Sequence, residues 1–189
     1  MRVLPWATVI AVAAAVAVFF WPGAARALQW DRLQILSGEW WRVLTGSWVH
    51  LDRSRLWWNV AVLLPAGIWA EYVQPWRARA LYLVAPLIIG GGLYLLEPQL
   101  MRFGGLSGVA TAFVVFLALA QLKVSETDRW FWRLVLALVA LKIIVEVLLA
   151  SRVLAHYSDP GMRATALAHV AGAAAGVIAL GARRRRAKR

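Results

Sequence analysis

The stretch GGLSGVATAF, residues 104–113, leads from a pair of glycines through a serine into an apolar segment. A second apolar stretch, ALAHVAGAAAGVIAL at 166–180, holds a histidine near its start. A hydroxyl or imidazole that faced lipid would lose its hydrogen bonds to water, so we expect Ser107 and His169 to face inward. If they meet at one depth, they form a nucleophile and its base. The fold and the chemistry therefore depend on how these two stretches pack.

The composition indicates a helical membrane protein. Of the 189 residues, 62% are hydrophobic, a share that a soluble domain of this size rarely tolerates. There is no cysteine, which excludes disulfides, thiolate catalysis and cysteine metal sites. The sequence implies no metal and no cofactor.

The net charge of +12 would suit a nucleic-acid partner, but its placement argues against one. The densest basic run, Arg183–Arg186 with Lys188 and Arg189, directly follows an apolar stretch. The positive-inside rule and anionic lipid both favour basic residues at that position. We therefore expect the lipid bilayer, and no nucleic acid, as the partner of this segment.

Six apolar stretches are long enough to cross a bilayer, and no repeat or long linker separates them. They predict an all-α membrane protein, a single domain over residues 1–189 built as a bundle of six transmembrane helices. The first stretch also has a feature of signal peptides, because residues 25–27 are similar to a cleavage site. Its apolar run, residues 3–21, is longer than the hydrophobic region of a typical signal peptide, which favours a helix that is retained in the protein. The expected spans are residues 4–22, 56–73, 80–97, 107–123, 130–150 and 165–182.

The distribution of basic residues favours an orientation with both termini in the cytoplasm. That orientation puts the basic tail and the short, arginine-containing inner loops on the same side, as the positive-inside rule requires. The spans that hold Ser107 and His169 then both descend from the outer face. The two side chains are therefore expected at similar depth, near that face.

The surroundings of Ser107 suit a nucleophile. Gly104, Gly105 and Gly108 would permit close backbone approach and leave N–H groups free at a helix start, where an oxyanion needs donors. Neutral imidazole is the commonest base for a serine near pH 7. The alternative is that Ser107 only caps the helix.

His169, Gly172 and Gly176 share one helix face by their i, i+3, i+7 spacing. Small residues there let a second helix come close, which would bring the span at 107–123 against the span at 165–182. In the alternative, the glycines only pack helices and His169 bonds a backbone carbonyl.

A further polar set precedes and opens the second span: His50, Arg55 and Asn59. Arg55 and Asn59 lie one helical turn apart, and the amide of Asn59 can donate to an oxyanion. Asn59 could equally tie two helices together. The tryptophans and Arg42 in residues 38–51 indicate a segment in the outer headgroup layer.

Lys142 and Glu146 stand one turn apart inside the fifth span. Opposite charges within a membrane are tolerated mainly as a pair that faces protein. The pair could be a structural link, a polar contact for a substrate, or half of a proton pathway as in a small transporter.

Four short segments, taken in their order along the chain, resemble conserved segments of the rhomboid family of intramembrane serine proteases. The resemblance implies a six-helix core and a Ser–His dyad without an acidic third member, with Ser107 as nucleophile and His169 as general base. It also implies an oxyanion site around Asn59 and the backbone at Ser107, a glycine packed behind the base at Gly172, and a structural glutamate at Glu71. The segments are WWRVLT (40–45), His50 with Asn59, GGLSG (104–108) and AHVAG (168–172), and the oxyanion and supporting residues are Asn59, His50, Arg55, Gly105 and Leu106.

Two positions depart from the family pattern. The family usually has a histidine where this chain has Arg55, and an aromatic that stacks on the catalytic histidine where this chain has Thr111. A fixed positive charge with a longer reach changes the oxyanion site. These departures favour an alternative function, a catalytically impaired rhomboid-like protein that binds transmembrane helices without cleaving them.

The short chain and the Lys142–Glu146 pair look most like the rhombosortase branch. That branch processes bacterial proteins with a C-terminal Gly-Gly motif, a hydrophobic helix and a basic tail. The resemblance implies membrane-anchored protein substrates, a bacterial inner (cytoplasmic) membrane location, and an active site toward the periplasmic face. The sequence specifies neither the particular substrate nor the oligomeric state.

Overall fold

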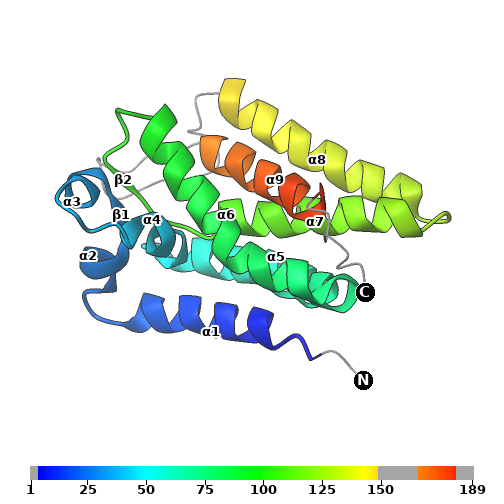
Figure 1. The fold of residues 1–189 in the computed structure, drawn as a ribbon, viewed down its shortest axis with the longest axis horizontal. Coiled ribbons are helices and arrows are strands. Elements are labelled where there is room, and N and C mark those ends of the chain that lie inside the picture. The colour runs from blue at the N-terminus through cyan, green and yellow to red at the C-terminus, as the bar shows by residue number, and fades with distance from the viewer. Residues whose placement is uncertain (1–3, 149–165, 182–189) are drawn as a thin grey trace, which may run out of the picture.

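Residues 4–148 and 166–181 are described in this computed structural model. Within them, a long helix occupies each of the six ranges in which the sequence predicts an apolar span (Figure 1). The ends of the last two predicted spans, at 149–150, 165 and 182, and the basic tail lie outside the described residues. The long helices are α1 (Trp6–Phe20), α5 (Arg53–Val73), α6 (Pro75–Leu96), α7 (Ser107–Val124), α8 (Arg129–Leu148) and α9 (Ala166–Gly181).

Two helices start earlier than their apolar stretches. α5 begins at Arg53 because the carboxylate of Asp52 accepts the N–H of Arg55 at 2.9 Å, which satisfies an N-terminal donor of the helix. α6 begins at Pro75, and proline is favoured at the first helical position because its fixed φ suits a helix start. Polar first turns therefore extend both helices beyond the predicted spans.

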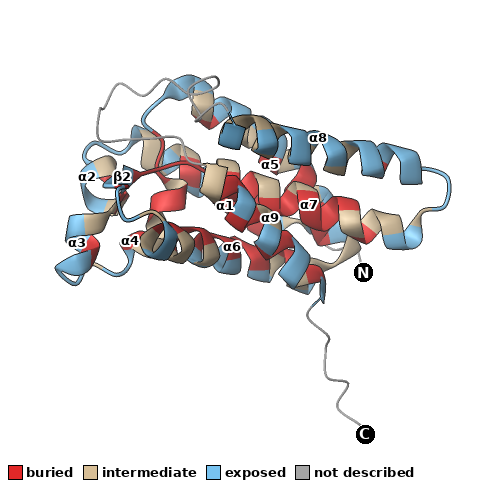
Figure 2. Ribbon diagram, turned by 90° about the horizontal axis from the view of Figure 1, so that it is seen from above, coloured by how far each residue is buried: buried red, intermediate tan, exposed pale blue. Residues whose placement is uncertain are grey.

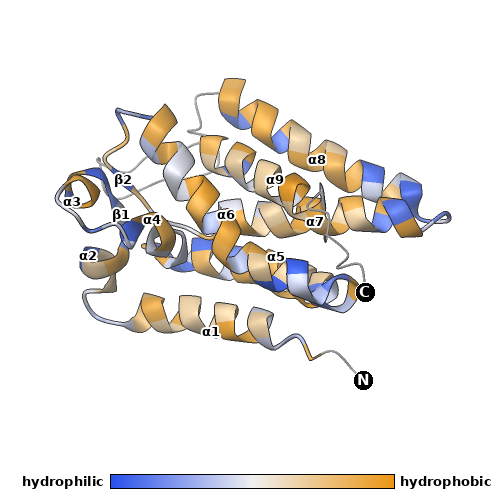
Figure 3. Ribbon diagram, viewed as in Figure 1, coloured by the Kyte–Doolittle hydropathy of each residue, from blue (hydrophilic) through white to orange (hydrophobic). Residues whose placement is uncertain are grey.

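Among the described residues, α6 and α7 are long and apolar enough to cross a membrane. α1 and α9 are apolar but shorter, with 15 and 16 residues. Hydrophilic residues gather at the two ends of the bundle and hydrophobic residues lie between them (Figure 3). The arrangement is that of a bundle with an apolar middle, and the number of spans stays a prediction.

A buried carboxylate ties α1 to α5 and α6. Glu71 has no exposed surface, and its Oε1 accepts both the backbone N–H and the hydroxyl of Thr8 at 2.7 Å. Arg79 donates to Oε2 at 3.0 Å, and Tyr82 donates to the Thr8 hydroxyl at 2.8 Å. Since a buried charge must be paired and hydrogen-bonded, this network fixes the three helices together. The first helix is thus packed into the bundle.

The segment between α1 and α5 is folded into short elements. Trp30 donates its indole N–H to the carbonyl of Gly90 at 3.1 Å. Arg42 is buried and donates to the carbonyls of Gln29 and Arg26 at 2.9 and 2.8 Å. These side chains satisfy backbone oxygens that a loop would otherwise leave unpaired. The elements are α2 (Ala24–Leu28), β1 (Trp30–Asp31), α3 (Arg32–Leu36), α4 (Arg42–Thr45) and the 3-10 helix η1 (Gly46–Trp48), with β1 antiparallel to β2 (Arg102–Phe103).

α7 and α9 make the closest helix pair. A Cβ at Gly172 would overlap the carbonyl oxygen of Gly108, and one at Gly176 would lie 2.5 Å from that of Ala112. Both partners advance by four residues, so the two helices are parallel and in register. Buried residues concentrate on this pair, whereas α8 is largely exposed (Figure 2). The register places His169 level with the start of α7, where Ser107 lies.

Candidate active site

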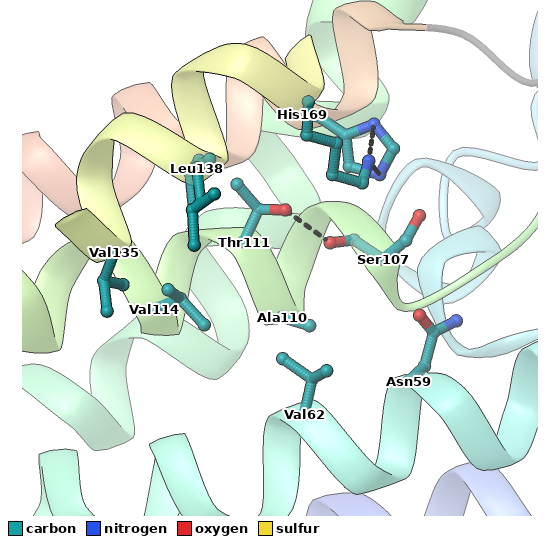
Figure 4. A pocket seen from close by; sticks show the side chains of 11 residues that line it. Asn59, Val62, Ser107, Ala110, Thr111, Val114, Val135, Leu138 and His169 are labelled. Atoms are coloured by element: carbon teal, nitrogen blue, oxygen red, sulfur yellow. Dashed lines mark hydrogen bonds between the residues drawn. The ribbon is translucent and has the colours of Figure 1, made fainter. Parts of the chain in front are cut away.

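α5, α7, α8 and α9 line a partly open cavity of about 330 Å³. One end of the cavity is polar, and aliphatic side chains of α5, α7 and α8 line the rest (Figure 4). The polar lining consists of Asn59, Ser107, Thr111, Lys142 and His169.

Ser107 is the first residue of α7 and does not cap it. The residue at the cap position is Leu106, and among the described residues no side chain caps the first turn. The chain enters the helix through Gly105, whose φ of +141° is one that L side chains rarely adopt. The carbonyl of Ser107 accepts the hydroxyl of Thr111 at 2.9 Å, while its own hydroxyl bonds no described residue. This hydroxyl and the free N–H groups thus border the cavity.

His169 lies on the same cavity but is held by α8. Its Nδ1 is 2.6 Å from Oε2 of Glu146, and the ammonium of Lys142 lies 3.1 Å from each ring nitrogen. Lys142 also bonds Oε1 of Glu146 at 2.6 Å. Within the described part of the chain, no hydrogen bond joins the imidazole to Ser107. Such bonds are often long or absent without substrate and tighten in the reacting complex.

His50 organises the oxyanion side of the cavity. Its Nε2 accepts the backbone N–H of Leu106 at 3.3 Å and lies 3.0 Å from Nδ2 of Asn59. Burial and then the charge of Arg55 lower the pKa of His50 to about 4, so the ring is neutral at pH 7. Because Nε2 accepts, the proton is on Nδ1. The remaining amide proton of Asn59 stays available to a bound oxyanion.

The predicted site residues therefore fall into three groups. Asn59, Ser107 and His169 share the cavity, and His50 with Leu106 supports them from behind. Arg55 lies outside the lining, with its guanidinium 3.8 Å from the position a Cβ would take on Gly105. Gly172 and Gly176 lie on the face of α9 that contacts α7.

The contact of Glu146 with His169 is the feature that sequence reasoning did not find. The sequence places the Lys142–Glu146 pair in the fifth span and leaves its role open. A partial signal was present, because in the predicted topology the fifth span ends at the face where the sixth span begins. Counting depth along both spans would have placed Glu146 level with His169, without showing whether the two side chains face each other.

These features define a class of protein: an apolar helical bundle with a serine, a histidine and an amide donor on one partly open cavity. Comparison with protein families gives the match, since the Rhomboid domain covers residues 37–186. The chain belongs to the rhomboid family, whose members are membrane-integral serine proteases that act on membrane-embedded substrates. No curated protein matches the sequence.

Proposed function

We propose that this protein is an intramembrane serine endopeptidase with Ser107 and His169 as its catalytic dyad. The observation that carries the proposal is that both side chains line one cavity together with the amide of Asn59. Membership of the rhomboid family supplies the reaction class. The unbonded hydroxyl and free N–H groups at the start of α7 support the same reading, since both are needed for acyl transfer.

In the proposed reaction, Oγ of Ser107 forms a bond to the scissile carbonyl carbon while Nε2 of His169 takes its proton. The amide of Asn59 and the first N–H groups of α7 stabilise the oxyanion. The imidazolium then protonates the leaving nitrogen as the C–N bond breaks, which leaves an acyl ester on Ser107. A water that gives a proton to His169 then attacks the ester carbon. The C–Oγ bond breaks, the imidazolium returns the proton to Oγ of Ser107, and the other product leaves as a carboxylic acid.

The proposed setting is a bacterial inner membrane, with residues 1–189 as one domain of six membrane-crossing helices. Both termini lie in the cytoplasm and the cavity lies toward the periplasmic face. The hydrophilic ends and apolar middle of the bundle support a membrane-crossing arrangement, and the distribution of basic residues supports its orientation. Substrate reaches the cavity laterally with its helix locally unwound, because a helical peptide bond is shielded from attack.

The proposed substrates are membrane-anchored proteins of the rhombosortase type, with a Gly-Gly motif before a hydrophobic helix and a basic tail. Ala110 and Thr111, which line the cavity near Ser107, are small, and this supports a substrate whose glycines bring the main chain close to the cavity wall. The polar Lys142–Glu146 pair beside His169 is the second supporting feature. A reporter with this tail should be cleaved, and replacement of both glycines by valine should prevent cleavage.

A fluorophosphonate probe tests the dyad directly. The purified full chain should be labelled, and Ser107→Ala and His169→Ala should not, because they lack the nucleophile and its base. Ser37→Ala is the matched control, since Ser37 is exposed in the segment between α1 and α5. Labelling that persists in Ser107→Ala would refute the proposal.

A second candidate function is a rhomboid-like protein that binds transmembrane helices without cleaving them. The absence of a Ser107–His169 hydrogen bond within the described residues favours it, together with Arg55 and Thr111 at the two departing positions. Folded wild-type protein that neither reacts with the probe nor cleaves any tail, yet retains tagged tails in a pull-down, would establish this function.

A further inference from the structure

We propose that Glu146 is a positioning residue that holds His169, so that this site works as a Ser–His–Glu set instead of a dyad. The inference rests on the proposed protease function and deepens it. It also separates this chain from the two-membered site that the family resemblance implies.

The contact has the geometry of a working acid–base pair. Oε2 of Glu146 lies 2.6 Å from Nδ1 of His169, at the short end for a hydrogen bond between a ring N–H and a carboxylate. The two side chains are 12% and 10% exposed, so little water competes for the contact. An ionised carboxylate can only accept, which puts the ring proton on Nδ1. Nε2 is then the basic nitrogen, the one that must take the proton of Ser107.

Lys142 completes the arrangement as the counter-ion of the carboxylate. Its ammonium bonds Oε1 of Glu146 at 2.6 Å, which offsets the cost of a charge in an apolar bundle. With Nδ1 donating to Glu146, the lysine can donate only to Nε2, 3.1 Å away. The side chain of Lys142 is 40% exposed, so it can turn away when Nε2 engages Ser107.

The helix arrangement gives the carboxylate this role. α9 supplies the base and α7 the nucleophile, and their close glycine packing sets the backbones. It does not set the rotation of the imidazole about its side-chain bonds. Glu146 reaches the ring from α8 and contacts Nδ1. A carboxylate there orients the ring and stabilises the imidazolium formed during the reaction.

The first test reads the imidazole without any reaction. The chain has three histidines, so ¹⁵N-histidine spectra of the full protein in micelles are simple, and His169→Ala assigns the signal of interest. We expect wild type to show a proton on Nδ1 of His169. In Glu146→Gln the ammonium of Lys142 should hold the amide oxygen, so the NH₂ group faces Nδ1 as a donor and the ring proton should move to Nε2. Glu126→Gln, at an exposed site before α8, is the matched control. An unchanged His169 signal in Glu146→Gln would overturn the inference.

The second test is the rate of fluorophosphonate labelling. Loss of the orienting carboxylate should slow labelling in Glu146→Gln by about 10⁴-fold, the size of the effect when the acid of a Ser–His–Asp triad is replaced by its amide. Glu146→Asp keeps the charge with a shorter reach, so it should retain the Nδ1 proton and react at an intermediate rate. This variant also keeps the inference testable if the glutamine variant does not fold.

The outcomes separate this inference from the protease proposal. Labelled wild type with equally fast Glu146→Gln would refute the role of Glu146 and leave the dyad intact. Unlabelled wild type would refute the protease, while the ring spectrum still tests the hydrogen bond. If Lys142→Met lost labelling completely and Glu146→Gln kept it, Lys142 would be the base and the inference would fail. We expect Lys142→Met to keep the Nδ1 proton and to label less than tenfold more slowly.

Discussion

Glu71 and Glu146 are both carboxylates paired with a cation in an apolar bundle, but their surroundings differ. Glu71 has no exposed surface, and all its partners lie on α1 and α6, away from the cavity. Glu146 is 12% exposed and bonds a histidine that lines the cavity. Glu71 joins helices. Glu146 contacts Nδ1 of His169, and Nε2 of the same ring is the nitrogen proposed to take the proton of Ser107. The residue that each carboxylate bonds, more than its depth of burial, distinguishes a structural carboxylate from one that positions a catalytic residue.

Replacing Glu71 should produce the largest loss of stability. Glu71→Gln removes the negative charge that pairs with Arg79, and breaking a buried pair on one side costs about 3–5 kcal/mol. The unfolding midpoint in denaturing detergent should fall accordingly. The ¹⁵N signal of His169 should not change. Glu146→Gln should instead cause a small loss of stability and change the ¹⁵N signal of His169. Equal losses of stability in Glu71→Gln and Glu146→Gln would contradict the proposed difference between the two carboxylates.

The long helices could be predicted from the sequence because they depend on local apolar content. The short elements between α1 and α5 could not, because contacts distant in sequence create them. Arg32 shows this, since its guanidinium donates to the carbonyls of Leu93, Tyr94 and Glu97 at the end of α6, more than 60 residues away. No pattern within residues 24–48 indicates these acceptors.

The site was predictable to the extent that polar groups avoid lipid. That rule places Ser107 and His169 inward, and both line the cavity. It also identifies Lys142 and Glu146 as a pair. It does not give the rotation of α8 about its axis, which decides whether Glu146 meets His169 or another helix. The rotation of α8 about its axis depends on how it packs against the other helices, so it cannot be predicted from the pattern of residues in α8 alone.

The second largest effect should be a dependence of stability on pH that comes from His50. Its pKa is about 4 in the folded protein and about 6.5 when exposed, so the unfolded state binds more protons between these values. The stabilisation is therefore complete above about pH 6.5 and is lost as the pH falls toward 4, by about 3 kcal/mol in total. Unfolding in detergent at several pH values measures it. His50→Gln should flatten this part of the profile, and an equally steep profile would assign the loss to other groups.

The contact between α7 and α9 joins the two regions, and Gly172→Ala tests it. The added methyl would overlap the carbonyl of Gly108, and overpacking of this kind costs about 1–3 kcal/mol. Because the register of α9 sets the level of His169, probe labelling should slow as well. Gly91→Ala in α6 is the control, since nothing lies within 4 Å of its Cβ position. That variant should be neutral or slightly stabilising.

The smallest effect should come from Thr111, whose hydroxyl bonds the backbone carbonyl of the nucleophile. Thr111→Val keeps the shape of the side chain and removes the hydrogen bond to the carbonyl of Ser107, a contact worth about 0.5–1.5 kcal/mol. Thr111 is only half-buried, and water can replace the lost donor, so the change in stability should lie at the lower end. Labelling should slow only a few-fold, because the imidazole is oriented from α8. A loss as large as that of Glu146→Gln would mean that the first turn of α7, and not the carboxylate, controls the geometry of the site.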